Sequence, residues 1–187
     1  MSTNIQRIER GIDPAKYALY MQDVAQTIQR DALQCSRATL PPIQRDLDLS
    51  TLIQQVDFFG HFKHQIALNV AEIIASTDDR VLAIYLFDDS INPDAETEDN
   101  IPIDATIHLL VQVTSRSAAL EAFISSLDRA LTQQLNDLSL IALGQYTSIL
   151  DVIPVTEADT EKRRGYAFSL LSSWYAPPLK IWAKEGS

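Results

Sequence analysis

The feature that most constrains the fold is a change in hydrophobic period near residue 80. Before this point, apolar residues recur every three or four positions, which predicts amphipathic helices. Residues 81–87 then form a short, continuous run of apolar, β-branched and aromatic side chains, which predicts a buried strand. Residues 105–113 have the same character, and the apolar stripe from Leu120 to Leu135 predicts a long helix after them. The chain is therefore expected to adopt an α+β fold.

Proline and glycine set the expected boundaries of the helical half. A first helix should begin at Asp13-Pro14, because aspartate caps helices and proline is tolerated at the first helical position. It should end before Pro41-Pro42, since a proline pair cannot continue a helix. A second helix is expected from about residue 49 to residue 77, with a bend or break at Gly60.

The C-terminal part alternates between the two kinds of element. Residues 148–155 predict a third strand, and residues 157–173 predict a helix that is interrupted around Gly165. Residues 179–183 could form a last short strand, whose direction the sequence leaves open. We therefore expect a small mixed sheet of three or four strands with helices packed on one face.

The composition is that of a folded chain with a hydrophobic core. Of the 187 residues, 46% are hydrophobic and 21% are charged, which excludes a disordered chain. We expect a helical N-terminal segment over residues 1–60 and an α+β domain over residues 61–187. The two could be separate units or one compact domain overall.

The charge and the single cysteine restrict the partners and the compartment. A formal net charge of -10 is repelled by phosphate, so we expect neither nucleic acid nor an anionic membrane surface as a partner. Cys35 cannot form an internal disulfide, which suits a reducing compartment. Residues 1–11 lack the apolar segment of a secretory signal, and no apolar run reaches the length of a membrane span. The sequence thus predicts a cytoplasmic protein.

The strongest compositional anomaly is an acidic segment between the first two predicted strands. No lysine or arginine lies between Arg80 and Arg116. The segment could contact a basic protein partner, collect a divalent cation, or remain a solvated loop, and its spacing does not match an EF-hand. Its acidic residues are Asp88, Asp89, Asp94, Glu96, Glu98, Asp99 and Asp104.

Two other groups of residues are candidates for a site. Asp57, His61 and His64 share a helix face and could ligate zinc, although surface or half-buried histidines explain the same pattern. Trp174 and Trp182 could form a ledge for a partner, or they could anchor the C-terminus to the core. No phosphate-binding glycine loop and no nucleophile elbow is present, so we predict no cofactor and no catalytic residues.

Residues 62–185 resemble the nucleotidyltransferase fold of small antibiotic- and antitoxin-type transferases. In that family, a helix leads into an apolar strand that ends in Phe-Gly-Ser, and a second strand carries Asp-x-Asp before Leu-Leu-Val. Here the first strand is Ile84-Tyr85-Leu86-Phe87, followed by Asp88-Asp89 in place of Gly-Ser. The second is Thr106-Ile107-His108-Leu109-Leu110-Val111.

The resemblance implies a site that has lost its chemistry. Thr106 and His108 stand where the family has its two metal-binding aspartates, and Asp151 matches the third acid of the family. Holding two Mg²⁺ ions on a triphosphate needs paired carboxylates, because Mg²⁺ prefers oxygen ligands. One carboxylate cannot do this, so the resemblance implies a degenerate transferase.

The same residues are also similar to the C-terminal domain of SseB-like proteins. Those proteins share the order of helix, strand, acidic loop, Leu-Leu-Val-type strand, amphipathic helix, strand with Val-Asp and aromatic ending. This resemblance implies no enzymatic activity.

Three functional hypotheses follow. We favour a non-catalytic protein-binding or regulatory module, such as a regulator, a chaperone-like protein or an immunity-type inhibitor, whose acidic segment and tryptophan edge meet a basic protein. The first alternative is a metal-dependent enzyme that uses Asp57, His61 and His64, or Asp88, Asp89 and Asp151. The second alternative is a structural subunit that forms a homo-oligomer through its N-terminal helices.

Overall fold

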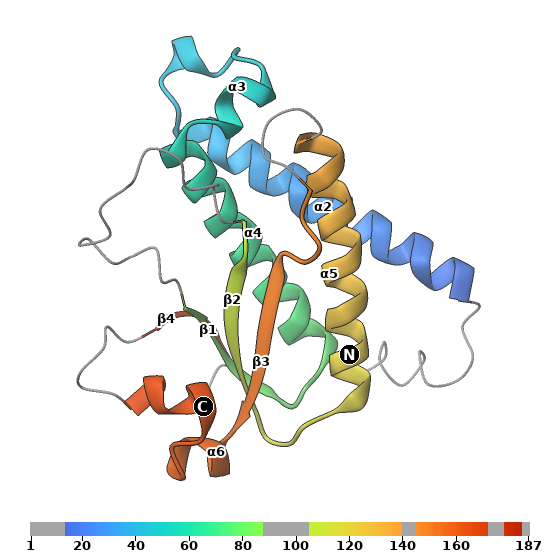
Figure 1. Ribbon diagram of the computed structural model, residues 1–187, viewed down its shortest axis with the longest axis vertical. Helices are drawn as coiled ribbons and strands as arrows, with labels where there is room; N and C mark the ends of the chain where they lie inside the picture. The colour runs from blue at the N-terminus through green and yellow to red at the C-terminus, as the bar shows by residue number, and fades with distance from the viewer. Residues whose placement is uncertain (1–13, 88–104, 140–144, 172–177, 185–187) are drawn as a thin grey trace.

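The computed structural model describes residues 14–87, 105–139, 145–171 and 178–184 as eleven elements (Figure 1). These elements are α2 (Pro14–Thr39), η1 (Pro42–Gln44), α3 (Leu49–Ile53), α4 (Val56–Thr77), β1 (Val81–Phe87), β2 (Ile107–Val113), α5 (Ala118–Ser139), β3 (Leu150–Thr156), α6 (Glu157–Glu161), η3 (Gly165–Leu171) and β4 (Leu179–Ala183).

The four strands form one mixed sheet in the order β3-β2-β1-β4. Strand β1 is antiparallel to both of its neighbours, whereas β2 and β3 are parallel. A parallel pair needs a crossover connection, and α5 lies in the crossover between β2 and β3. The predicted α+β class and the mixed sheet are confirmed, and the last strand proves to be antiparallel to its neighbour.

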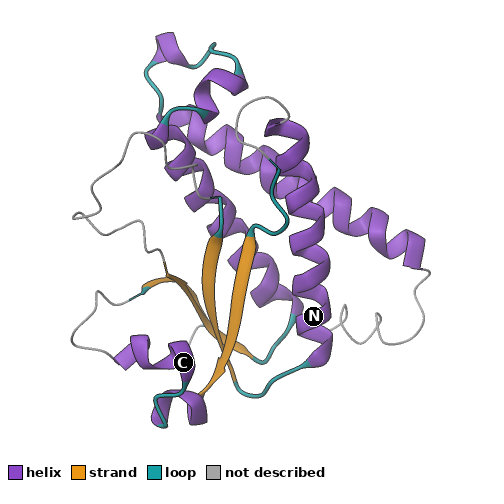
Figure 2. Cartoon of the chain, in the orientation of Figure 1, coloured by secondary structure: helices purple, strands orange, loops and turns teal. Residues whose placement is uncertain are grey.

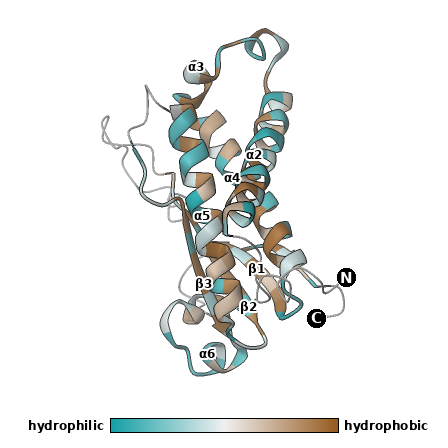
Figure 3. Ribbon diagram, turned by 90° about the vertical axis from the view of Figure 1, so that its right-hand side faces the viewer, coloured by the Kyte–Doolittle hydropathy of each residue, from teal (hydrophilic) through white to brown (hydrophobic). Residues whose placement is uncertain are grey.

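Helices α4 and α5 cover one face of the sheet, and α2 packs against both of them (Figures 1 and 2). Hydrophobic residues gather in the strands and in the helical turns beside them (Figure 3). Two side chains tie α2 to its neighbours: Gln29 donates to the carbonyl of Gln134 at 3.1 Å, and Asn69 donates to the carbonyl of Ile28 at 3.3 Å. The apolar stripe of α2 is thus covered by α4 and α5, a point that the sequence left open.

The opposite face of the sheet, called the outer face below, carries a much smaller cluster. Leu110 and Val155 lie at its centre, and Ala167 of η3 packs onto them. Tyr85, Ile153 and Leu170 are the half-buried members of this cluster. The outer face is therefore covered in part by a C-terminal segment rather than by a long helix.

The free edge of the sheet at β3 has most of its outward N–H groups occupied. Ile107 donates to the carbonyl of Ile149, so alternation along the strand turns Leu150, Val152, Pro154 and Thr156 away from β2. The carboxylate of Asp128 accepts from the N–H of Leu150 at 2.8 Å, and that of Asp159 accepts from the N–H of Thr156 at 3.0 Å. Proline has no N–H. Among these four residues, Val152 alone presents a free outward N–H.

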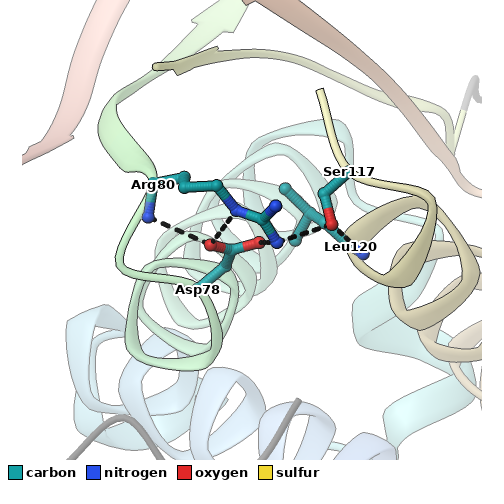
Figure 4. Close-up of polar contacts among 4 residues, drawn as sticks. All are labelled: Asp78, Arg80, Ser117 and Leu120. Atoms are coloured by element: carbon teal, nitrogen blue, oxygen red, sulfur yellow. Dashed lines mark hydrogen bonds and ion pairs between the residues drawn. The ribbon is translucent and has the colours of Figure 1, made fainter. Parts of the chain in front are cut away.

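A buried polar cluster joins α4, β1 and α5 (Figure 4). Asp78, whose side chain is 4% exposed, accepts two hydrogen bonds from the guanidinium of Arg80 at 2.9 and 2.8 Å. Arg80 also donates to the hydroxyl of Ser117 at 2.6 Å, and this hydroxyl accepts from the N–H of Leu120 in the first turn of α5. Ser117 therefore acts as the N-cap of α5.

The helix expected over residues 49–77 is two helices, and the predicted break at Gly60 is wrong. The break lies at Gln54–Gln55, between α3 and α4, and Gly60 lies inside α4. Phe58 and Phe59 on one side of Gly60 and Phe62 on the other are all buried. Their packing keeps the helix continuous through the glycine.

The helix expected over residues 157–173 is interrupted next to Gly165, as predicted. Helix α6 ends at Glu161, and the segment after the interruption is the 3₁₀ helix η3 instead of an α-helix. Arg163, at φ +49°, donates to the carbonyl of Thr160, and Arg164 donates to that of Asp159. These two bonds form a Schellman turn with arginine at the left-handed position where glycine is usual.

Candidate functional site

Three side chains from three neighbouring strands form a row at one end of the outer face. Phe87 ends β1 and pairs in register with His108 of β2, which pairs in turn with Asp151 of β3. In the next row, Tyr85, Leu110 and Ile153 follow the same register. The first row borders a recess, and Leu110 and Ile153 of the second row line it as well, while the second row also belongs to the outer cluster.

The polar pair in this row is well defined. His108 Nδ1 lies 2.9 Å from Asp151 Oδ2, and the two side chains are 31% and 50% exposed. An ionised carboxylate can only accept hydrogen bonds, so the ring nitrogen must donate. This contact fixes the orientation of the carboxylate and leaves much of it in contact with solvent.

Aromatic side chains form the wall of the recess. The rings of Phe87 and Tyr166 meet edge to face, with their centroids 6.3 Å apart. Tyr166 is 53% exposed, and Phe168, two residues further along η3, is 41% exposed. The recess has a volume of about 60 Å³ and is lined by Phe87, His108, Leu109, Leu110, Asp151, Ile153 and Tyr166.

The size of the recess decides which ligands it can hold. Sites for small molecules and cofactors usually enclose about 300–1,000 Å³. A recess of about 60 Å³ is far smaller than this range, so it does not enclose a ligand of that size.

A second depression lies on the other side of Asp151, between α5 and the edge of β3. It measures about 480 Å³ and is lined largely by polar side chains, among them Asp128, Arg129 and Thr132. Asp128 Oδ1 accepts from the N–H groups of both Ile149 and Leu150. Asp128 therefore holds the start of β3 in place.

The predicted partner-binding residues fall mostly outside the described part of the chain. Asp88, Asp89, Asp94, Glu96, Glu98, Asp99 and Trp174 lie there, and so does Asp104. The acidic segment nevertheless follows β1 in the sequence, and its first residue is bonded to Phe87, which lines the recess. Trp182 of β4 is half-buried and packs against the main core, and its role in partner binding stays a prediction.

The residues considered for metal binding are placed as follows. Asp57 is exposed, and His61 and His64 are half-buried along α4. Within the described ranges, no three His, Cys, Asp or Glu side chains come close enough together to hold a metal ion. Cys35 is exposed on α2.

Sequence reasoning identified only part of this site. His108 and Asp151 were singled out through the resemblance, as a replaced acid and a retained one, but not as a hydrogen-bonded pair. Tyr166 was not singled out. The available signals were a histidine within an apolar strand and an aromatic residue next to Gly165.

Comparison of the chain with protein-family models, with curated proteins and with solved structures finds no match in any of the three. No described helix is both long enough and apolar enough to cross a lipid bilayer.

Proposed function

We propose that the protein is a non-catalytic protein-binding or regulatory module that receives a basic partner on the outer face of the sheet. The observation that carries this proposal is the small recess with aromatic walls, formed by the half-buried Phe87 and the exposed Tyr166 around Asp151. Aromatic residues in small pockets often supply most of the binding free energy of protein interfaces.

The position of the acidic segment supports the same proposal. Residues 88–104 carry seven acidic side chains, and the segment begins with the residue after Phe87, which lines the recess. Carboxylates near an interface attract a basic partner over several ångströms and raise its association rate. The segment would provide attraction at long range, and the recess would provide contact at short range.

The experiment is affinity purification of the tagged full chain from its source cells, followed by direct binding of the purified partner by calorimetry at low and high salt. We expect one stoichiometric basic protein whose affinity falls with salt. Replacing Asp94, Glu96, Glu98 and Asp99 by Asn or Gln should weaken binding, and so should Tyr166→Ser. Tyr20→Ser is the matched control, because Tyr20 is 50% exposed on α2, away from the recess.

Equal binding by all three variants would refute the role of this face. Recovery of a metal or a nucleotide without a protein partner would refute the binding module itself.

A degenerate nucleotidyltransferase-like site is the second candidate, and the pairing of His108 with Asp151 is the observation that favours it. Two of the three positions that the resemblance assigns to the metal site meet on adjacent strands. This candidate predicts that Mg²⁺-triphosphate perturbs the NMR signals of both residues and that Asp151→Asn abolishes the effect. Unchanged spectra would remove it.

A further inference from the structure

We propose that the recess at Phe87, His108, Asp151 and Tyr166 is a receptor for one arginine side chain of the partner. This inference rests on the proposed function and names the group that the recess recognises.

The floor of the recess offers an acceptor that suits a guanidinium group. Asp151 offers a half-exposed carboxylate that His108 orients through one oxygen at 2.9 Å. Within the described residues, no other side chain bonds this carboxylate, so its second oxygen can accept an N–H donor from a ligand. A guanidinium group presents donors in a planar fork that suits a carboxylate.

The walls of the recess are aromatic, which suits a planar cation. A planar cation packs favourably on an aromatic face, and arginine does so more often than lysine. A cation already packs on an aromatic ring of the same sheet face, because Lys180 Nζ lies 5.5 Å from the ring centroid of Tyr85. Tyr85 lies one row away from Phe87 on the same strand.

The surrounding charge also favours a cation. Seven acidic residues lie within the 17 positions that follow Phe87, and their charge attracts a cationic ligand. Three basic residues, Lys162, Arg163 and Arg164, come shortly before Tyr166 and are exposed. They disfavour a densely basic ligand, so a single arginine between neutral residues is the best probe.

The test is an NMR titration of the isotope-labelled full chain with acetyl-Gly-Arg-Gly-amide. The control ligand carries citrulline, which has nearly the same shape as arginine but no charge. We expect the arginine peptide to shift the signals of His108, Asp151 and Tyr166 at concentrations at which citrulline does not, with an affinity ratio of about fivefold to tenfold. A lysine peptide should bind with intermediate strength.

Two variants locate the effect. Asp151→Asn preserves the shape of the side chain and should remove most of the preference for arginine over citrulline. Tyr166→Leu keeps an apolar side chain without a ring face and should weaken binding by a few-fold. Asp137→Asn, which neutralises an exposed carboxylate on α5, is the matched control and should change nothing. Thermal unfolding of each variant verifies that it is folded.

Equal affinity for the arginine and citrulline peptides, or equal arginine binding by the Asp151→Asn variant, would overturn the receptor. If a basic partner still requires residues 94–99 but is indifferent to Asp151→Asn, the proposed function stands and the receptor fails. If the peptide binds at the recess but no protein partner is captured, the receptor stands and the proposed function fails.

Discussion

The two faces of the sheet differ in how completely they are covered. The face under α4 and α5 belongs to a large core that also includes α2, and its side chains are almost fully excluded from water. The outer cluster has three buried residues, Leu110 and Val155 on the sheet and Ala167 on η3, and the row beside it remains half-exposed. Because hydrophobic stabilisation scales with the apolar area removed from water, most of the stability lies on the helical face. The outer face can carry exposed aromatic and charged groups at little cost to the fold.

Two adjacent leucines of β2 test this difference between the two faces most directly. Leu109 faces the main core and Leu110 faces the outer cluster, and both are almost completely buried. We expect Leu109→Ala to lower the free energy of unfolding by about 4 kcal/mol and Leu110→Ala by about 2 kcal/mol. The difference arises because the short segment η3 can collapse onto a cavity more easily than packed helices can.

Chemical denaturation of both variants with urea measures these values. Equal losses would show that the outer cluster is as rigid as the main core and would contradict the comparison.

The polar cluster at Asp78 allows a pH test of the helical side. Burial of the Asp78 carboxyl raises its pKa, but its bonds from Arg80 outweigh burial and hold the pKa below its ordinary value. A pKa that is lower in the folded state stabilises the fold above the pKa of the unfolded chain. This contribution is lost as the pH falls from about 4 through the lower folded value.

We expect Asp78→Asn to lower the free energy of unfolding at pH 7 by about 2 kcal/mol, because the Arg80 guanidinium loses a charged acceptor. The variant should also lose stability less steeply than the wild type below about pH 4. Thermal unfolding between pH 7 and pH 2.5 measures both effects. Parallel pH profiles for the two proteins would show that Asp78 does not stabilise the fold through its charge.

The smallest expected effect lies on the outer side, at the Schellman turn. Arg163 has φ +49°, a region that costs a residue with a Cβ atom about 1–2 kcal/mol. Arg163→Gly should therefore stabilise the protein by about 0.5–1 kcal/mol, after the entropy of glycine in the unfolded chain is included. Arg164→Gly removes the same charge at a negative φ and should give no gain. A stabilisation of equal size in both variants would indicate relief of charge repulsion instead of backbone strain.

The sequence predicted the fold well where local pattern and tertiary structure agree. The strands at residues 81–87 and 179–183 have the predicted bounds, because both are short apolar runs between polar or proline-containing segments. The break at Gln54–Gln55 was missed because neither residue is a helix breaker by itself. Glycine is a weak helix former, so Gly60 was predicted to break the helix. The helix continues because its neighbours Phe59 and Phe62 are held by tertiary packing.

The candidate site was less predictable, since it depends on register. Forty-three residues separate His108 from Asp151, and only the pairing of two parallel strands brings them to 2.9 Å. Tyr166 reaches the recess because η3 crosses the outer face, a placement that no local pattern of residues 165–171 encodes. The functional role of the acidic segment stays a prediction.

The occupied edge at β3 limits how copies of this protein can join. Growth of a fibre by strand addition requires every molecule to offer two competent edges, one for each neighbour. With Asp128 and Asp159 bound to its N–H groups and Pro154 lacking one, β3 keeps a free outward N–H only at Val152 among these four residues, which makes it a poor template for a further strand. Within the described sheet, strand addition is therefore directed to the other edge, at β4, and addition at one edge joins a pair of sheets instead of a continuing fibre.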